Sequence, residues 1–338
     1  MSKAKTWRNL ILGIVIALVA LYLTYQRADL PALGEILSSA SMPMLLLVIP
    51  FLACSYLFRI ARWKVLLAPV SEVSFGQITG PLLTGFAVNS LLPGRVGELL
   101  RALMLSRKSR IPRASCFATV VLARLFDGLT LTAFTLGLLL TGWNSMGETT
   151  RLGLIGAGLL YIGVLAGLVS LRIWSEKAAR AMSAPVKLLS SKLGEKLQNV
   201  LLSFSRGLAV LQSGREVVTV AALSAGVWLS LVVSVVPAFA SLGLSLRWSY
   251  PFLVLVLAAF GMLIPTPAGT GTVHYAIGVV MPTMTAIGPT DAKALAIVFH
   301  ATQFLPIIIA GLLGAAREGV RARDMERMAE RAEAGSDR

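Results

Sequence analysis

Residues 89–101 read NSLLPGRVGELLR, and this stretch decides the fold that the sequence predicts. It joins an apolar run at 74–92 to a basic stretch at 95–113 that holds six Lys and Arg residues. If the apolar run crossed a membrane, those six cations would lie outside, against the tendency of Lys and Arg to stay in the cytoplasm. Pro93 and Gly94 can instead stop one helix and turn the backbone. We therefore expect residues 77–105 to form a re-entrant hairpin broken at Pro93 and Gly94.

The composition around this stretch is that of an integral membrane protein. Hydrophobic residues make up 56% of the 338 residues and charged residues 14%, against about 25% charged residues in an ordinary soluble chain. Windows such as 115–140 and 152–171 are long and apolar enough to cross a hydrocarbon core as helices. The sequence therefore predicts an all-α integral membrane protein.

The net charge of +15 is gathered into five basic stretches that alternate with the apolar ones. Residues 3–8, 59–64, 95–113, 172–215 and 317–338 hold 26 of the 31 Lys and Arg residues. The positive-inside rule explains this pattern without any nucleic acid as a partner. We expect a protein of the cytoplasmic (inner) membrane with both termini in the cytoplasm.

This assignment of sides predicts the topology. About six spanning helices are expected, at about 9–25, 43–62, 114–140, 151–171, 217–240 and 294–315, with outer loops at 26–42 and 241–249. A second broken apolar segment, at 250–288, is expected to be re-entrant from the opposite face. Residues 183–212 have apolar positions at helical spacing, which predicts a cytoplasmic amphipathic helix on the membrane surface.

The two broken segments indicate an internal repeat of opposite orientation. Phe86-x6-Pro93-x3-Gly97 matches Phe260-x6-Pro267-x3-Gly271 at a constant offset of 174 residues. Inverted repeats of this kind are common in transporters. We expect one membrane domain over 1–316, with half A at 1–145 and half B at 146–316, followed by a charged cytoplasmic tail at 317–338.

The first tip has the chemistry of an anion site. Arg95 stands where the second half-helix begins, and the free N–H groups of a helix start favour an anion. Glu98 and Arg101 follow at helical spacing. A guanidinium group matches phosphate oxygens bidentately, so a phosphate headgroup is a suitable ligand. In the alternative interpretation, both arginines only anchor the helix at the membrane interface and Glu98 pairs with one of them.

Two further groups of charges lie inside apolar helices. Arg124 and Asp127 are three residues apart, and charges within a bilayer are usually paired or functional. They form either a structural ion pair or a pair that opens for a substrate or exchanges partners with Glu98. Arg59 and Arg62 are either interface anchors or additions to an anion site.

The second tip, at 265–274, is rich in small residues and threonine, which allow close backbone approach and supply hydroxyl groups. His274 is either a proton-coupled group or a neutral hydrogen-bonded histidine. His300 and Gln303 are three residues apart on the last helix and are more typical of interhelical hydrogen bonds than of ligands.

We find no sequence motif of a catalytic site, a nucleotide site or a metal site, and the two cysteines lie in apolar segments. We therefore expect no enzyme activity, no metal and no cofactor.

At the two tips the sequence resembles the lysylphosphatidylglycerol synthase transmembrane family, also called the flippase-like domain family. The resemblance covers about residues 7–316 and rests on Arg59-x2-Arg62-Trp63, Asn89-x3-Pro93-Gly94-Arg95-x-Gly97-Glu98-x2-Arg101, Arg124-x2-Asp127 and Pro265-x-Pro267-x-Gly269-x-Gly271. It implies an all-helical domain with re-entrant segments that moves lipids between leaflets. In multiple peptide resistance factors, this domain translocates aminoacylated phosphatidylglycerol made by an attached soluble synthase.

Two departures from the family pattern matter. The second tip of the family commonly reads P-G-G-x-G-x-x-E, whereas this chain has Ala268 in place of the first Gly and His274 in place of the Glu. This puts a role for that acid, and the identity of the substrate, in doubt. Residues 317–338 read as a short tail instead of a synthase domain, so we expect no aminoacyl transfer by this chain.

The sequence thus predicts a translocase for a phospholipid or a lipid-linked headgroup, with membrane lipids as partners. The alternatives are a non-transporting scaffold for a separate lipid-modifying enzyme, and an enzyme that acts on lipid-linked sugar. The candidate substrate-binding residues are Arg59, Arg62, Asn89, Pro93, Gly94, Arg95, Gly97, Glu98, Arg101, Arg124, Asp127, Pro265, Pro267, Gly269, Gly271, His274 and Gln303.

Overall fold

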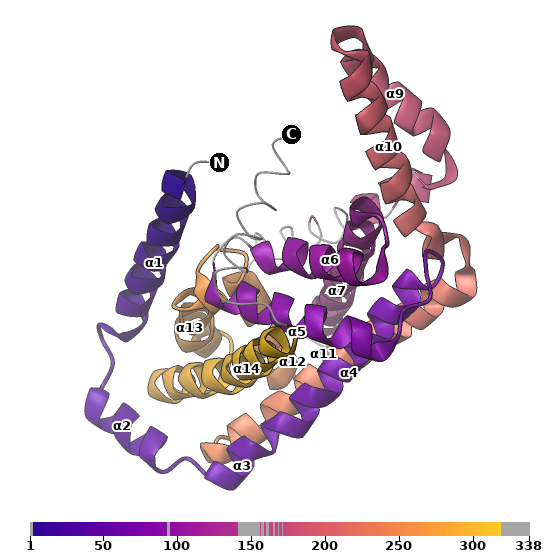
Figure 1. Cartoon of the computed structure of the whole chain (residues 1–338). Helices are drawn as coiled ribbons and strands as arrows, with labels where there is room; N and C mark the ends of the chain where they lie inside the picture. Colours follow the sequence, from indigo (N-terminus) through magenta and orange to yellow (C-terminus); the bar gives the residue numbers. More distant parts are fainter. Residues whose placement is uncertain are drawn as a thin grey trace.

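The computed structural model describes residues 3–92, 95–140 and 172–318, together with scattered positions between 156 and 170. Every regular element in these residues is a helix (Figure 1). The predicted fold class, an all-α membrane protein, is confirmed.

Four stretches of the described chain are long and apolar enough to cross a membrane, or five if the bent pair α1 and α2 counts as one span. They are Met42–Leu67, which comprises α3 (Met42–Leu46) and α4 (Val48–Leu67); Arg113–Leu138 within α7 (Arg113–Leu140); α11 (Gly214–Ser241); and α14 (Pro289–Arg317). These correspond to four of the six expected spans. Two expected spans remain. The first in chain order, at about 9–25, corresponds to α1 (Lys3–Tyr25), and the one at 151–171 lies largely outside the described residues.

The expected outer loop at 26–42 is wrong in one respect, because it contains the helix α2 (Leu30–Ser38). The Asp29 side chain caps this helix by accepting a hydrogen bond from the Ala32 N–H at 3.1 Å, and Pro31 lies in the first turn. Both residues favour a helix start. The segment 10–25 and α2 meet at 97°.

The two broken segments each fold back on themselves. In the first, α5 (Phe75–Leu91) packs against α6 (Val96–Ser109), and the break at Pro93 and Gly94 lies outside the described residues. A capping box of Ser74 and Gln77 starts α5. In the second, α12 (Tyr250–Gly261) packs against α13 (Thr272–Tyr275), with the 3-10 turn η2 (Pro267–Gly269) between them and the turns η3 (Ala276–Val280) and η4 (Met281–Thr283) after them.

The element bounds repeat at the offset of 174 residues. Shifted by this offset, α4 falls inside α11, α5 spans α12, α6 spans α13 to η4, and α7 overlaps α14. The packing repeats as well, because α5 packs on α14 while α12 packs on α7, and α4 and α11 pack on each other. The opposite orientation of the two halves in a membrane stays a prediction.

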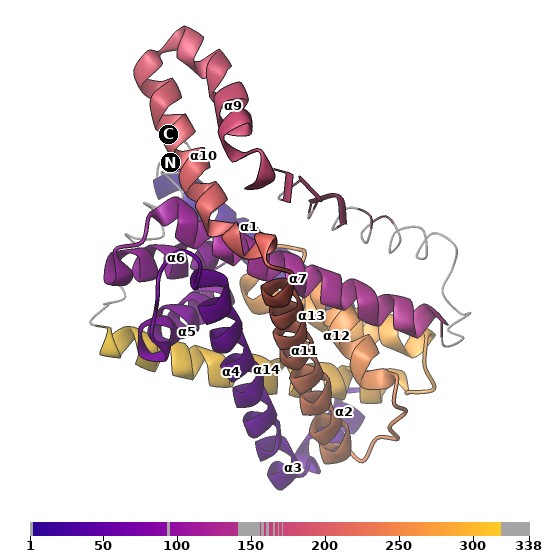
Figure 2. The same cartoon turned by 90° about the vertical axis from the view of Figure 1, so that its right-hand side faces the viewer.

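The region predicted as one amphipathic helix at 183–212 is instead a hairpin of two helices, α9 (Ser175–Leu189) and α10 (Ser191–Gly207), followed by the turn η1 (Ala209–Gln212). Ser190 breaks the helix with an extended backbone, and its side chain caps α10. The two arms pack on each other and project from the bundle on the side where α1 begins (Figures 1 and 2). Met182, Leu193 and Val200 of the two arms remain exposed, and the predicted location on the membrane surface stays a prediction.

The buried side chains form two large cores, one in each half. The first includes Trp63, whose indole Nε1 donates to Thr119 Oγ1 at 2.9 Å, and the second includes Phe239. The long helices contribute to both cores: Leu52 of α4 belongs to the second, and Val220 of α11 belongs to the first. The two halves are thus joined along α4 and α11.

Candidate functional site

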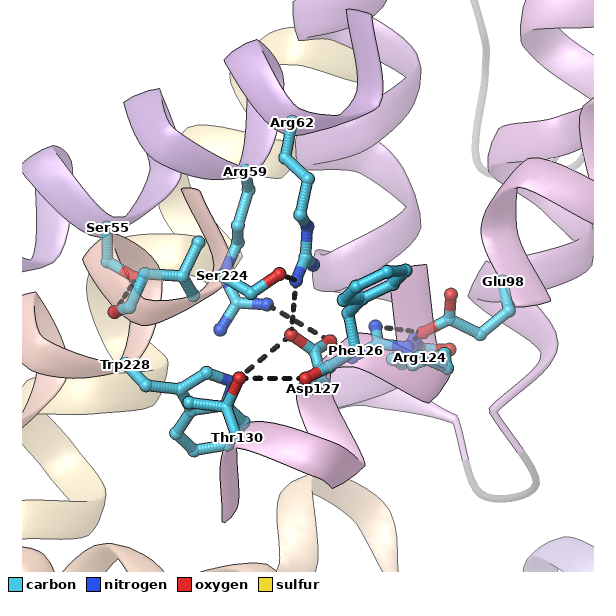
Figure 3. Close-up of polar contacts among 12 residues, drawn as sticks. Ser55, Arg59, Arg62, Glu98, Arg124, Phe126, Asp127, Thr130, Ser224 and Trp228 are labelled. Atoms are coloured by element: carbon cyan, nitrogen blue, oxygen red, sulfur yellow. Dashed lines mark hydrogen bonds and ion pairs between the residues drawn. The ribbon is translucent and has the colours of Figure 1, made fainter. Parts of the chain in front are cut away.

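Six charged side chains from α4, α6 and α7 meet between the helices of the first half. We call this group the arginine cluster; it consists of Arg59, Arg62, Glu98, Arg101, Arg124 and Asp127. Figure 3 labels all of these residues except Arg101. The sequence had assigned these residues to three separate motifs. The structure brings all of them into one connected network of ion pairs.

Asp127 is the centre of one half of the cluster. Its carboxylate accepts hydrogen bonds from Arg62 Nη1 at 2.7 Å, Arg124 Nη1 at 3.1 Å and Trp228 Nε1 at 3.1 Å. Arg62 Nη1 also donates to Ser224 Oγ at 2.9 Å. The predicted pair of Arg124 and Asp127 is present, but it is one of several contacts.

Glu98 is the centre of the other half. Its carboxylate accepts from Asn89 Nδ2 at 3.0 Å and pairs with Arg101 Nη2 at 2.6 Å and with Arg124. Arg124 therefore lies between Glu98 on α6 and Asp127 on α7. An exchange of Arg124 between the two carboxylates stays a prediction.

An aromatic ring lies within the cluster. The guanidinium carbons of Arg59, Arg101 and Arg124 lie 4.9, 5.5 and 5.1 Å from the centre of the Phe86 ring. Rings at such distances attract cations. Phe86 thus compensates part of the repulsion among arginines that approach one another closely.

The cluster holds more positive than negative charge. Four guanidinium groups face two carboxylates, which leaves a surplus of two positive charges. Arg59 has the weakest internal partner, because its Nη1 lies 3.9 Å from Asp127 Oδ2. Its Nε and Nη1 are buried with no hydrogen-bond partner in the described part of the chain. The arrangement can therefore accept an anion that supplies oxygen atoms to these donors.

Two glycines bring α5 and α6 close enough to build the cluster. A Cβ atom on Gly97 would collide with the carbonyl oxygen of Gly85 and lie 2.6 Å from Asn89 Oδ1. A Cβ atom on Gly85 would lie 2.7 Å from the Gly97 carbonyl oxygen. The predicted site residue Gly97 therefore serves the close helix contact that positions Asn89, Glu98 and Arg101.

Arg95 lies apart from the arginine cluster. It precedes α6 with a left-handed backbone (φ 55°), and its exposed side chain donates from Nη2 to the Met262 carbonyl at 3.2 Å. Met262 follows α12, so this bond joins the two tips. Pro93 and Gly94, also predicted for this site, lie outside the described residues.

The second tip is uncharged and built from close backbone contacts. Gly269 and Gly271 have φ values of 68° and 80°, and a Cβ atom on Gly271 would collide with the Ala17 carbonyl oxygen of α1. Pro267 starts the turn η2, whereas Pro265 is exposed in the loop before it. The glycines thus allow the tip to pack against the first helix.

Both histidines of the chain meet at this tip. Their rings lie 4.6 Å apart, His274 Nδ1 accepts from the Gly271 N–H at 3.3 Å, and His300 Nε2 donates to the Ala268 carbonyl at 3.2 Å. Gln303 is elsewhere: its Nε2 donates to Ser234 Oγ on α11 at 3.0 Å, an interhelical hydrogen bond of the expected kind. Among the described residues, no group of His, Cys, Asp and Glu could hold a metal ion, and Cys54 and Cys116 are free.

Comparison with known proteins identifies the family. The family model described as the lysylphosphatidylglycerol synthase TM region matches residues 10–311. The chain belongs to this family. The resemblance predicted from the two tips is thereby confirmed. Glycosyltransferase AglD of Haloferax volcanii is 22% identical over 333 residues, an alignment that covers 90% of this chain and 53% of that protein. The chain thus spans about half the length of this relative. No solved structure matches the chain.

Three residues that contact the arginine cluster could not be found from the sequence. Phe86, Ser224 and Trp228 contact the charged groups but are uncharged residues of largely apolar helices. Phe86 had one signal, its place in the 174-residue repeat, which suggested a structural role only. Ser224 and Trp228 come from α11, so they complete the cluster from the second half.

Proposed function

We propose that this protein translocates a phosphate-bearing lipid between membrane leaflets, and that the arginine cluster binds the phosphate of the headgroup. The observation that carries the proposal is the surplus of two positive charges in a buried site of a membrane protein. Membership of a lipid-related family supports it. Because an uncompensated charge is costly at membrane depth, such a surplus is expected to have an anionic ligand.

Arg59 is the main phosphate ligand in this proposal. Its Nε and Nη1 have no hydrogen-bond partner among the described residues, whereas both carboxylates of the cluster are already engaged by other arginines. Arg95, exposed at the start of α6, makes the first contact with the headgroup. Arg101 and Arg124 then turn from the carboxylates towards the phosphate.

A second candidate function is an enzyme that acts on lipid-linked sugar, and the name of the relative AglD, a glycosyltransferase, favours it. A glycosyl-transfer site commonly needs a carboxylate free to accept or donate a proton. Glu98 and Asp127 are instead held in ion pairs with arginines. Translocation, with a lipid-linked sugar among the possible cargoes, is therefore the better proposal.

The test is lipid transfer by the full chain in reconstituted vesicles, with a fluorescent phosphatidylglycerol in one leaflet. Arg59→Gln should lower the transfer rate at least about tenfold, because charge-assisted bonds to the phosphate are lost. Its melting temperature should change little, since Arg59 has only one long ion pair, at 3.9 Å. Lys64→Gln is the matched control, because it removes an exposed cation of the same helix outside the cluster.

Two results would contradict the proposal. Normal transfer by Arg59→Gln would remove Arg59 from the phosphate site. Equal losses in Arg59→Gln and Lys64→Gln would show a general effect of charge on the membrane orientation instead of a specific site.

A further inference from the structure

A cleft lies where α1 ends, apart from the arginine cluster. It has a volume of about 640 Å³ and is formed by the end of α1, the turns η3 and η4, and the start of α14. In Figure 1 this is the end of α1 that leads into α2.

Lys293 is the central polar residue of this cleft. It lines the cleft, and only 8% of its surface is exposed. Within the described chain its ammonium group has no hydrogen bond and no ion pair, since the Tyr25 hydroxyl bonds only its backbone oxygen. A lysine that is nearly buried as a residue and has no counter-charge is expected to bind an anion at its ammonium group.

The surroundings of Lys293 favour an anion as well. Arg27 lines the same cleft with an exposed side chain, and no carboxylate is among the described residues that line it. Pro289, the first residue of the 29-residue helix α14, also lines the cleft, and no side chain caps that helix start. The partial positive charge of a helix start adds to the attraction.

The other side chains of the cleft are largely apolar, among them Leu23, Tyr275, Val279 and Pro282. A cation beside an apolar wall matches a phosphate carried on a hydrocarbon chain. We infer that this cleft binds the phosphate group of a membrane lipid, as a second headgroup site in addition to the arginine cluster. The inference deepens the proposed translocation, because it supplies the site at which the headgroup rests in the other leaflet.

A series of contacts runs from Arg95 to the cleft. Arg95 bonds the second tip at Met262, and that tip bonds His300 through Ala268. His300 faces His274, whose ring lies 6.3 Å from the ring of Tyr25 beside the cleft. The second tip therefore lies between Arg95, the proposed first contact of the headgroup, and the cleft.

The experiment uses the full chain and a photoreactive phosphatidylglycerol with a diazirine near its phosphate, and maps the labelled peptides by mass spectrometry. The wild-type protein should be labelled in the cleft. Lys293→Met should lower this labelling about tenfold, as expected for a lost charge-assisted bond. Lys293→Arg should retain most of it. Arg247→Met is the matched control, because it removes an exposed cation from the loop after α11, outside the cleft.

Labelling at the arginine cluster is the internal reference, since it should stay unchanged in Lys293→Met if the variant is folded. Equal cleft labelling in Lys293→Met and wild type would overturn the inference. So would equal labelling by a diacylglycerol probe that lacks phosphate. Loss of labelling in millimolar inorganic phosphate would assign the site to the free ion and overturn its assignment to lipid.

The outcomes also separate this inference from the proposed function. A protein that is labelled in the cleft but transfers no lipid would reject translocation and leave the second site standing. A protein that transfers lipid normally without any cleft labelling would reject the second site alone.

Discussion

The two tips occupy equivalent positions in the 174-residue repeat but differ completely in charge. At that offset, Arg95 corresponds to Gly269, Glu98 to Thr272 and Arg101 to Tyr275. The other cluster residues also have uncharged counterparts: Val233 for Arg59, Val236 for Arg62, Val298 for Arg124 and Ala301 for Asp127. Both tips nevertheless share the left-handed backbone, at Arg95 in the first and at Gly269 in the second.

This difference shows which properties belong to the scaffold and which to the site. Both halves keep the break, the close helix packing and the glycine at the position of Gly97 and Gly271. Among the described residues, only the first half has the six charged side chains of the arginine cluster packed beside its broken segment. The first tip is therefore held by electrostatic pairing, and the second by backbone contact and two histidines. Variants at the two tips should respond accordingly.

The largest effect is expected at Asp127. Asp127→Asn leaves Arg62 and Arg59 without their only carboxylate, whereas Arg124 keeps Glu98. Stranding buried charges costs about 3–5 kcal/mol in a protein interior. Thermal unfolding in detergent should show a large fall in melting temperature. The double variant Arg62→Gln with Asp127→Asn should recover much of the loss, because Arg62 makes the shortest bond to Asp127, at 2.7 Å.

The same double variant separates stability from transport. If the cluster binds phosphate, Arg62→Gln with Asp127→Asn should keep some lipid transfer, because Arg59 and Arg101 remain. A melting temperature that is unchanged in Asp127→Asn alone would show that the first tip does not depend on electrostatic pairing, and the contrast between the tips would fail.

A smaller effect is expected at Gly97, where the two tips are alike. Gly97→Ala would place a Cβ atom against the Gly85 carbonyl and should cost about 1–3 kcal/mol through overpacking. Gly76→Ala on α5 is the matched control, because nothing lies within 4 Å of its Cβ position. Denaturation curves of both variants would measure the effect. Equal stability of the two would show that α5 and α6 do not approach as closely as the structure describes.

The smallest effect is expected at Ala268, where the neutral tip carries backbone strain. Ala268 has a φ of 52°, a left-handed conformation that costs a non-glycine residue about 1–2 kcal/mol. Ala268→Gly should therefore raise the melting temperature slightly, since the gain is partly offset by the greater freedom of glycine in the unfolded chain. A lower melting temperature in Ala268→Gly would show that packing of the Ala268 methyl group stabilises the fold by more than the backbone strain costs.

The sequence predicted the parts of the structure that depend on local pattern. Apolar length and the distribution of Lys and Arg predicted four of the described spans and both broken segments. It failed where a polar cap changes an element: Asp29 starts α2 in a predicted loop, and Ser190 divides a predicted single helix. Caps of this kind are single residues with weak signals among many similar ones.

The candidate site could be predicted only in part. The charges were found because a charge inside an apolar helix is conspicuous. Their partners were not, since the pairing of Arg62 with Asp127 joins residues 65 positions apart through helix packing. Lys293 lies near the start of a helix, where a lysine commonly reaches the membrane surface, so the sequence did not mark it as a site residue. Only its burial in the structure does so.

The shared cores along α4 and α11 have a consequence for cooperativity. Each long helix supplies side chains to the core of its own half and also to the core of the other half, where Leu52 and Val220 are fully part of the core. Neither half can therefore unfold without exposing part of the core of the other half. Although the chain is built from two similar halves, it should melt in a single thermal transition, and neither half expressed by itself should reach the fold it has in the whole.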